Sequence, residues 1–234
     1  MADRDEEQVP ADPRDWGPMR PYSGRRSFDI TDPIVEPFWS GVRVIAHVVS
    51  TPDAARAADV ALIEDFGADL APELPDLSEA IGTNVMAVDA VVDGVISRQV
   101  GLDGVGAAAI AEMRKRPGMI MRNEADLDVV ARGAVSEPGD GPDGFVAFDL
   151  LRVDGTSLLD VPLLERKRLL ESVIVTSELV RASVHVRPPW ESWIATWKSM
   201  GLRGGLLKAA NSRYRPGEDT IEWRIVENLG KRRP

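Results

Sequence analysis

Few side chains in this sequence could perform nucleophilic or metal chemistry. There is no cysteine, which excludes disulfide frameworks, thiolate metal sites and cysteine nucleophiles. The two histidines, His47 and His185, are far apart in the sequence, so we expect no histidine metal site. Amines remain as candidates for covalent attack. The chain has five lysines: Lys115, Lys167, Lys198, Lys208 and Lys231.

Composition and charge narrow the class of protein. The chain has 234 residues, of which 44% are hydrophobic and 28% charged, as is usual for folded domains. Its formal net charge of −10 opposes binding to nucleic-acid phosphates unless basic residues gather on one face. No run of about 18 apolar residues predicts a membrane span, and the acidic N-terminus is unlike a signal peptide. We therefore expect a cytoplasmic protein without a membrane partner.

Apolar patterns predict the strands that must position any site. Strands are expected at residues 42–49, 60–63, 145–152 and 184–186. Residues 86–92 and 95–100 are expected to form a hairpin around Asp93-Gly94, since an Asp-Gly pair supplies the positive φ angles of a tight turn. A second Asp-Gly turn is expected at Asp154-Gly155.

Helices are expected between these strands, at residues 105–116 and 162–174, with a loop at 136–144. A third helix carries Trp190, Trp193 and Trp197 and ends at Gly201. Its tryptophan stripe could stack on nucleic-acid bases, but helical spacing favours a packed core face. The irregular order of helices and strands predicts an α+β fold with mainly antiparallel sheets and flanking helices.

The chain is expected to form one domain. Residues 1–30 contain several prolines and acidic residues that interrupt any period, which indicates an extended or partly disordered segment. The predicted domain spans residues 31–230. A short basic tail follows at 231–234.

Three stretches, in order, resemble the nucleotidyltransferase (adenylation) domain of ATP-dependent DNA ligases. Residues 36–43, Glu-Pro-Phe-Trp-Ser-Gly-Val-Arg, resemble the family's lysine motif. Residues 145–151 are similar to its central strand, and residues 201–208 with 212–217 are similar to its late glycine-rich and Tyr-Arg-Pro-Gly segments. The resemblance implies the ligase and capping-enzyme type of nucleotidyltransferase fold. The family's DNA ligases also carry an OB-fold domain, for which we identify no counterpart up to Pro234.

The resemblance implies that lysine attacks the α-phosphate of ATP to give a lysyl–AMP intermediate, with Mg²⁺ held by carboxylates. The nucleophile position is Phe38, whose ring has no lone pair to attack with. Where the family has a glutamate on a strand, this chain has Val91 or Val95, depending on which Asp is matched. At the other altered positions, Ser40 replaces an aspartate, Asp65 an arginine and Arg203 a glutamate, and Ile225 and Glu227 replace two lysines. The chemical groups are replaced while the glycines and apolar positions persist.

Four family positions keep residues that could bind a nucleotide. By resemblance, Glu36 would lie at the adenine edge, Arg43 at the ribose or phosphate, Phe148 on the base and Lys208 near the phosphates. Stacking on one ring is worth only about 0.5–1.5 kcal/mol, so any binding should be weak. The simpler interpretation, which we favour, makes Phe148 a core residue and Lys208 a solvated cation.

We therefore expect a DNA-ligase-like domain without catalytic residues, acting as a binding or accessory module linked to DNA repair. No cofactor or metal is expected, and ATP with Mg²⁺ would be needed only if the family activity survives. One alternative is an active transferase that uses a non-standard nucleophile, for which Lys208 is the candidate. Another is a DNA-binding module, which the net charge opposes.

Overall fold

The computed structural model describes residues 10–22, 29–51, 58–98 and 143–226. Within these residues, the largest sheet has six strands, ordered β4-β3-β5-β6-β7 with β8 pairing in parallel on β6. The strands are β3 (Val42–Ser50), β4 (Ala58–Glu64), β5 (Asp89–Ser97), β6 (Gly144–Val153), β7 (Thr156–Ser157) and β8 (Val180–Ala182). All its other pairings are antiparallel.

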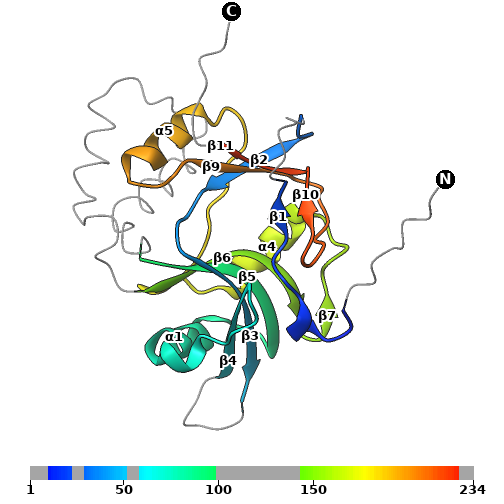
Figure 1. The fold of residues 1–234 in the computed structure, drawn as a ribbon, viewed down its shortest axis with the longest axis vertical. Helices are drawn as coiled ribbons and strands as arrows, with labels where there is room; N and C mark the ends of the chain where they lie inside the picture. The colour runs from blue at the N-terminus through cyan, green and yellow to red at the C-terminus, as the bar shows by residue number, and fades with distance from the viewer. Residues whose placement is uncertain (1–9, 23–28, 52–57, 99–142, 227–234) are drawn as a thin grey trace, which may run out of the picture.

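A smaller antiparallel sheet lies above the large one in Figure 1. It consists of β2 (Pro33–Pro37), β9 (Gly205–Ala209) and β11 (Trp223–Val226), in the order β11-β9-β2. A parallel pair, β1 (Arg20–Pro21) with β10 (Asp219–Thr220), lies beside it. The predicted α+β fold with mainly antiparallel sheets is therefore confirmed.

In the described part of the chain, three α-helices flank the sheets. They are α1 (Pro75–Asn84), α4 (Leu163–Val173) and α5 (Glu191–Ser199), and short 3-10 turns occur at η1 (Pro13–Asp15) and η2 (Ala71–Glu73). In Figure 1, α1 lies at the lower end beside β3 and β4, whereas α5 lies at the upper end beside β9. The predicted helices at 162–174 and at Trp190–Trp197 correspond to α4 and α5. The predicted helix at 105–116 and nearly all of the loop at 136–144 lie outside the described residues.

The predicted hairpin around Asp93-Gly94 is wrong. Strand β5 runs through both residues without turning, and Asp93 pairs with Ile45 on one side and Asp149 on the other. A Cβ on Gly94 would lie 2.5 Å from the Phe145 ring, so glycine serves close packing between strands here. The second Asp-Gly pair does turn the chain, with positive φ at both Asp154 and Gly155.

The strands at 42–49, 60–63 and 145–152 are confirmed as β3, β4 and β6. The strand expected at 184–186 is wrong. The chain pairs earlier, in β8, because Val180 joins the core of the large sheet beside Phe145. Val186 makes only an isolated bridge to Val35.

Alternation along β3 divides the core into two faces. Val44, Ala46 and Val48 point into a cluster that α1 covers with Leu77 and Ile81. Residues on the opposite face of β3 point toward the smaller sheet, where separate apolar clusters form. The space between the two sheets is therefore where the sequence motifs meet.

Part of the N-terminal segment packs on this inner face. Trp16 and Met19 are 5% and 1% exposed and share a cluster with Ile45, Tyr214 and Trp223. Backbone hydrogen bonds join Arg20 to Glu218 and Tyr22 to Thr220. These contacts hold residues 16–22 against the chain's C-terminal strands.

Candidate functional site

A buried glutamate lies between two buried lysines in the space between the sheets. Glu36 on β2 is 1% exposed, and its Oε1 lies 2.7 Å from Lys167 Nζ on α4. Lys208 Nζ on β9 donates a hydrogen bond of 3.2 Å to the other carboxylate oxygen, Oε2. Strands β2 and β9 are neighbours, which places Glu36 and Lys208 on the same side of their sheet. We call Glu36, Lys167 and Lys208 the glutamate–lysine cluster.

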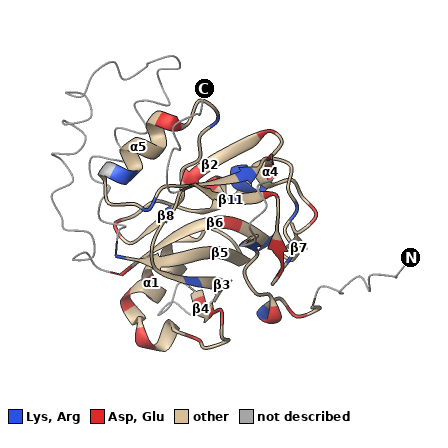
Figure 2. Ribbon diagram, turned by 45° about the horizontal axis from the view of Figure 1, so that its top comes forward, with Lys and Arg blue, Asp and Glu red and all other residues tan. Residues whose placement is uncertain are grey.

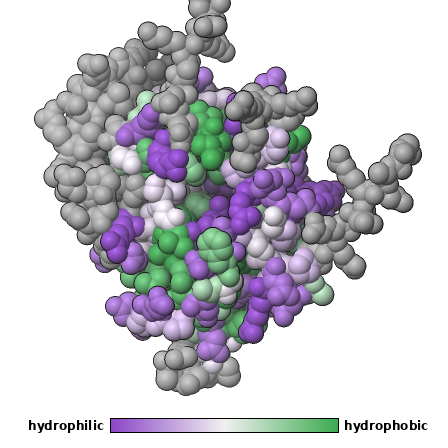
Figure 3. Space-filling view, in the orientation of Figure 1, coloured by the Kyte–Doolittle hydropathy of each residue, from purple (hydrophilic) through white to green (hydrophobic). Residues whose placement is uncertain are grey.

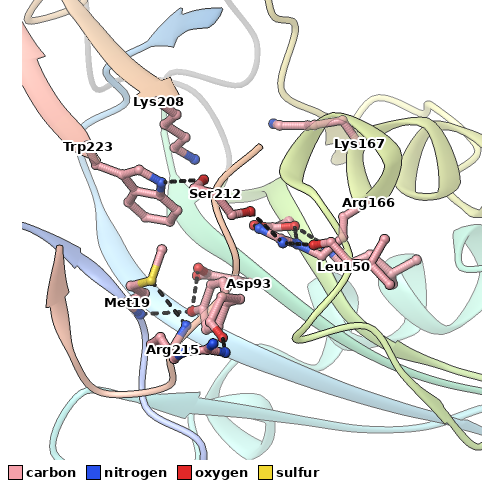
Figure 4. A network of polar contacts seen from close by, with 12 residues as sticks. Met19, Asp93, Leu150, Arg166, Lys167, Lys208, Ser212, Arg215 and Trp223 are labelled. Carbon is pink, nitrogen blue, oxygen red and sulfur yellow. Dashed lines mark hydrogen bonds and ion pairs between the residues drawn. The ribbon is translucent and has the colours of Figure 1, made fainter. Parts of the chain in front are cut away.

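Aromatic rings complete the surroundings of Lys208. Its Nζ lies 4.2 Å from the centre of the Trp223 ring and 5.5 Å from that of Phe148. Figure 4 shows Lys208 beside Trp223, with Lys167 approaching from the helix on the far side. The prediction that Lys208 is a solvated cation is wrong, because it is fully buried and ion-paired. The prediction that Phe148 is a core residue is confirmed by its 8% exposure within an apolar cluster.

Burial and charge compete over the pKa values of the cluster. Burial alone would raise the pKa of Glu36, but Lys167 and Lys208 outweigh it and bring that pKa below its ordinary value. Burial lowers the pKa of Lys208, assisted by the charges of Lys167 and Arg43 and opposed by Glu36. The amine of Lys208 is thus held closer to its neutral form than an exposed lysine.

These shifts predict how stability depends on pH. Since the folded pKa of Glu36 is lowered, its contribution is present above its unfolded pKa near 4.5 and is lost as pH falls through the folded pKa. Since the folded pKa of Lys208 is also lowered, the unfolded chain binds more protons between that pKa and 10.5, and Lys208 makes stability rise with pH there. Urea unfolding between pH 3 and 10 should show both slopes. A Lys208→Met variant should lose the alkaline slope and keep the acid one.

A second set of buried charges centres on Asp93 of β5. Arg43 Nε donates to Asp93 Oδ1 at 2.6 Å, and Arg43 Nη2 donates to Oδ2 at 2.5 Å. Tyr214 donates its hydroxyl proton to Oδ2 at 2.8 Å. The guanidinium of Arg43 also lies 4.9 Å from the centre of the Phe148 ring. Arg43 is therefore held by two groups of this chain, the carboxylate and the aromatic ring.

Tyr214 connects this pair to the N-terminal segment. Its hydroxyl oxygen accepts a hydrogen bond of 2.8 Å from the Met19 backbone N–H. Burial, together with the negative charge of Asp93, raises the pKa of Tyr214 well above its ordinary value. The hydroxyl therefore stays protonated and links Met19 to Asp93.

Removing that hydroxyl should destabilise the protein measurably. In Tyr214→Phe, the Met19 N–H and one oxygen of Asp93 lose a partner in a buried place. The expected loss of unfolding free energy is about 1–3 kcal/mol. Urea denaturation at pH 7 measures it. Tyr22→Phe, at a tyrosine that is 45% exposed, is the control and should lose less. Equal losses in the two variants would contradict the link.

A third buried pair fixes α4 to the large sheet. Arg166 donates through Nε and Nη2 to the two oxygens of Asp149 on β6, both at 2.8 Å. Its Nη1 donates to the backbone carbonyls of Val161 and Ser212. Both members of the pair are fully buried. Successive residues of α4 thus reach opposite sheets, since Arg166 contacts β6 and Lys167 contacts β2.

The positions where the resemblance implies catalysis show different contacts. Phe38 is half-buried, and the guanidinium of Arg203 lies 4.8 Å from its ring centre. The implied nucleophile and a glutamate position are thus occupied by a cation–π pair. Asp65 forms an ion pair with Arg20 at 3.0 Å. Among the remaining altered positions, Val91 and Val95 are buried, Ser40 is exposed, Ile225 is 40% exposed, and Glu227 lies outside the described residues.

The residues between the sheets do not suit a carboxylate-held magnesium ion. Both carboxylate oxygens of Asp93 and of Asp149 accept hydrogen bonds from one arginine, and both oxygens of Glu36 are paired with lysines. A divalent cation would have to displace these cations at close range, at a substantial electrostatic cost. The described residues also contain no group of three or more acidic or histidine side chains that could hold a metal ion.

The structure brings the four predicted residues together. Lys208 contacts Glu36 and Phe148, and Arg43 covers the same phenyl ring. Sequence reasoning missed Asp93, Asp149, Lys167, Arg166 and Tyr214 as members of this site. One signal was available, since acidic residues within the apolar strands 89–97 and 144–153 must be paired if buried.

Two other sequence features have structural roles. Ile194 and Trp197 of α5 are fully buried in an apolar cluster with Trp39, and Trp190 and Trp193 pack against it, so the tryptophan stripe is a core face as expected. His47 is on β3, and burial lowers its pKa. His185 lies 3.6 Å from Glu171.

Comparison with known proteins agrees with these motifs. Residues 131–224 match the family model described as "ATP dependent DNA ligase domain". A DNA ligase of Methanothrix thermoacetophila is 31% identical over 167 residues, which are 69% of this chain and 27% of that protein. The multifunctional non-homologous end joining protein LigD of Mycobacterium bovis is 26% identical over 185 residues, 79% of this chain and 20% of that protein. The matched part of the chain thus spans 27% and 20% of the length of these two relatives.

Solved structures show the same fold. The chain superimposes on mycobacterial DNA ligase D, solved with ATP and MES, with a TM-score of 0.58 at 21% identity, covering 91% of this chain and 60% of that one. The ligase domain of M. tuberculosis LigD gives a TM-score of 0.57 at 22% identity, covering 91% and 59%. Within the described residues, no helix has both the length and the apolar character needed to cross a membrane.

Proposed function

Since this chain is a DNA-ligase-like nucleotidyltransferase domain in sequence and fold, we propose that it has lost adenylyl transfer and serves as a binding or accessory module in DNA repair. One observation carries the proposal: the lysine position of the motif holds Phe38, and the Arg203 guanidinium lies against its ring. A phenyl ring cannot form a phosphoramidate with AMP. The mycobacterial relatives named for end joining support the link to DNA repair.

The polar groups between the sheets support the same conclusion. Arg43, which by resemblance would face ribose or phosphate, is held bidentately by Asp93. Glu36, expected at the adenine edge, is neutralised by the two lysines of the glutamate–lysine cluster. A nucleotide would have to break these internal pairs before it could make equivalent contacts, so its net gain would be small.

Labelling with ATP tests the loss of activity. Pure protein incubated with α-labelled ATP and Mg²⁺ should give no acid-stable labelled band on a denaturing gel. Restoring a lysine in Phe38→Lys should also leave the protein unlabelled, because Arg203 and the paired carboxylates still oppose metal binding. An active DNA ligase handled in parallel is the positive control. Covalent AMP on the wild-type chain would refute the proposal.

Lys208 supports one alternative, an active transferase with a relocated nucleophile. Its lowered pKa favours the nucleophilic neutral amine. Against this, its Nζ is fully buried and bonded to Glu36, between two aromatic rings. If label did appear, peptide mapping that placed AMP on Lys208 would establish this alternative.

A DNA-binding module is the second alternative. The fold's relatives are DNA ligases, yet the net charge of −10 opposes duplex binding. Nicked duplex at 50 mM salt should therefore show no mobility shift at low micromolar protein. A shift that disappears with added salt would favour this alternative.

A further inference from the structure

Phe66 is an apolar side chain presented to solvent in an ordered turn. It is 93% exposed, more than any other large hydrophobic residue in the described part of the chain. The turn is closed by hydrogen bonds from the Gly67 N–H to the Glu64 carbonyl and from the Glu64 N–H to the Ala68 carbonyl. Gly67 has a φ of 85°, which allows the reversal. The backbone of the turn therefore holds Phe66 outward, and almost all of its apolar surface remains in contact with solvent.

The surface around Phe66 is predominantly acidic. Residues 57–97 contain nine aspartates and glutamates and no lysine, arginine or histidine. Six of these carboxylates are exposed on β4, η2, α1 and the turns that join them: Asp59, Asp65, Asp69, Glu73, Asp76 and Glu79. In Figure 2, α1 shows acidic positions in red and none in blue. Arg20 brings a basic side chain onto this surface through an ion pair of 3.0 Å with Asp65.

Helix α1 and the Phe66 turn form one continuous structure. Residues 71–84 follow the turn directly, and α1 packs against β4 through Leu77 and Ile81. Asp69 lies between them and accepts hydrogen bonds from the backbone N–H groups of Leu62 and Ala71. The acidic side chains and Phe66 are therefore carried by a segment that hydrogen bonds and apolar packing attach to the large sheet.

We propose that Phe66 and the surrounding carboxylates, the α1 surface, bind a protein segment rich in lysine and arginine that offers an apolar contact for the phenyl ring. Aromatic anchors surrounded by charge are typical of protein interfaces, where the charges guide association and choose the partner. Nucleic acid is excluded by the sign of the charge, and a second copy of the same surface would repel itself. This inference names a partner class for the accessory role and rests on that proposed function.

The α1 surface lies away from the space between the sheets. In Figure 1, α1 is at the lower end of the molecule, and β2, β9 and β11 are at the upper end. Figure 3, in the same orientation, shows hydrophilic residues between the apolar patches on the face toward the viewer. The outcome of AMP labelling is consequently independent of binding at α1, and the two proposals can fail separately.

A charge-matched set of variants tests the proposal. The probe is a fluorescent 20-residue helical peptide with lysine and arginine on one face and a leucine stripe beside it, measured by anisotropy at 50 and 150 mM salt. Phe66→Ser should weaken binding at least tenfold, whereas Met86→Ser, at another exposed apolar position, should stay within twofold. The combined variant Glu73→Gln, Asp76→Asn and Glu79→Gln should also weaken binding at least tenfold.

The control for charge removes three carboxylates elsewhere. Glu178, Glu191 and Glu218 are exposed and lie outside the α1 surface, so their combined replacement by glutamine gives the same net charge. That control should bind within twofold of wild type. Equal weakening by both triple variants, unchanged binding in Phe66→Ser, or no binding of the basic peptide to wild type would each overturn the proposal. Tighter binding of a 20-bp duplex than of the peptide would also overturn it.

Discussion

Glu36→Gln should lower the free energy of unfolding by about 3–5 kcal/mol, the usual loss when one member of a buried ion pair is removed. Glutamine has nearly the same shape as glutamate, so packing changes little. The substitution removes the counter-ion of both Lys167 and Lys208, whose side chains are at most 1% exposed. Two like charges would then remain close together without a compensating anion. Urea denaturation at pH 7 measures the loss.

A rescue experiment separates charge from shape. Adding Lys208→Met to Glu36→Gln removes one of the uncompensated cations and should recover part of the lost stability. Glu165→Gln is the control, because Glu165 pairs with Arg168 on the exposed side of α4. Its stability should match that of wild type. If Glu36→Gln lost less than 1 kcal/mol, both lysines would have to be largely neutral in the folded state.

Arg166→Met is expected to have an effect of similar size, again about 3–5 kcal/mol. It leaves the carboxylate of Asp149 buried and unpaired, and it deprives the Val161 and Ser212 carbonyls of a donor. Arg168→Met supplies a control from the same helix, since Arg168 is an exposed neighbour. It should leave the unfolding midpoint in urea unchanged.

A double variant tests whether the Arg166–Asp149 pair acts as a unit. Asp149→Leu combined with Arg166→Met replaces both charges with apolar groups and should recover most of the stability that either change loses alone. Simple addition of the two losses would mean that each residue acts through other contacts. Circular dichroism melts of all three variants give this comparison.

Sequence patterning was sufficient for much of the fold. Alternation along residues 42–49 and 145–152 predicted β3 and β6, because one side of each strand must be buried. Apolar spacing likewise predicted α4 and α5. Asp93-Gly94 was misread because the pair suits a turn locally, while strand pairing on both sides of β5 keeps it extended. The close packing of Gly94 against Phe145 outweighs the local preference of the Asp-Gly pair for a turn.

The sequence by itself determined that the lysine position of the family motif holds no amine. A phenyl ring at position 38 has no lone pair wherever the chain places it, so the absence of a lysine nucleophile there needs no coordinates. Only the tertiary structure decided what the surviving polar residues do. Glu36, Lys167 and Lys208 are far apart in sequence, and their pairing depends on α4 lying between two sheets. Charge is a property of each residue, whereas its burial and its partner depend on the fold. In this fold, the charged residues that were expected to contact a nucleotide are paired with other side chains of the same chain.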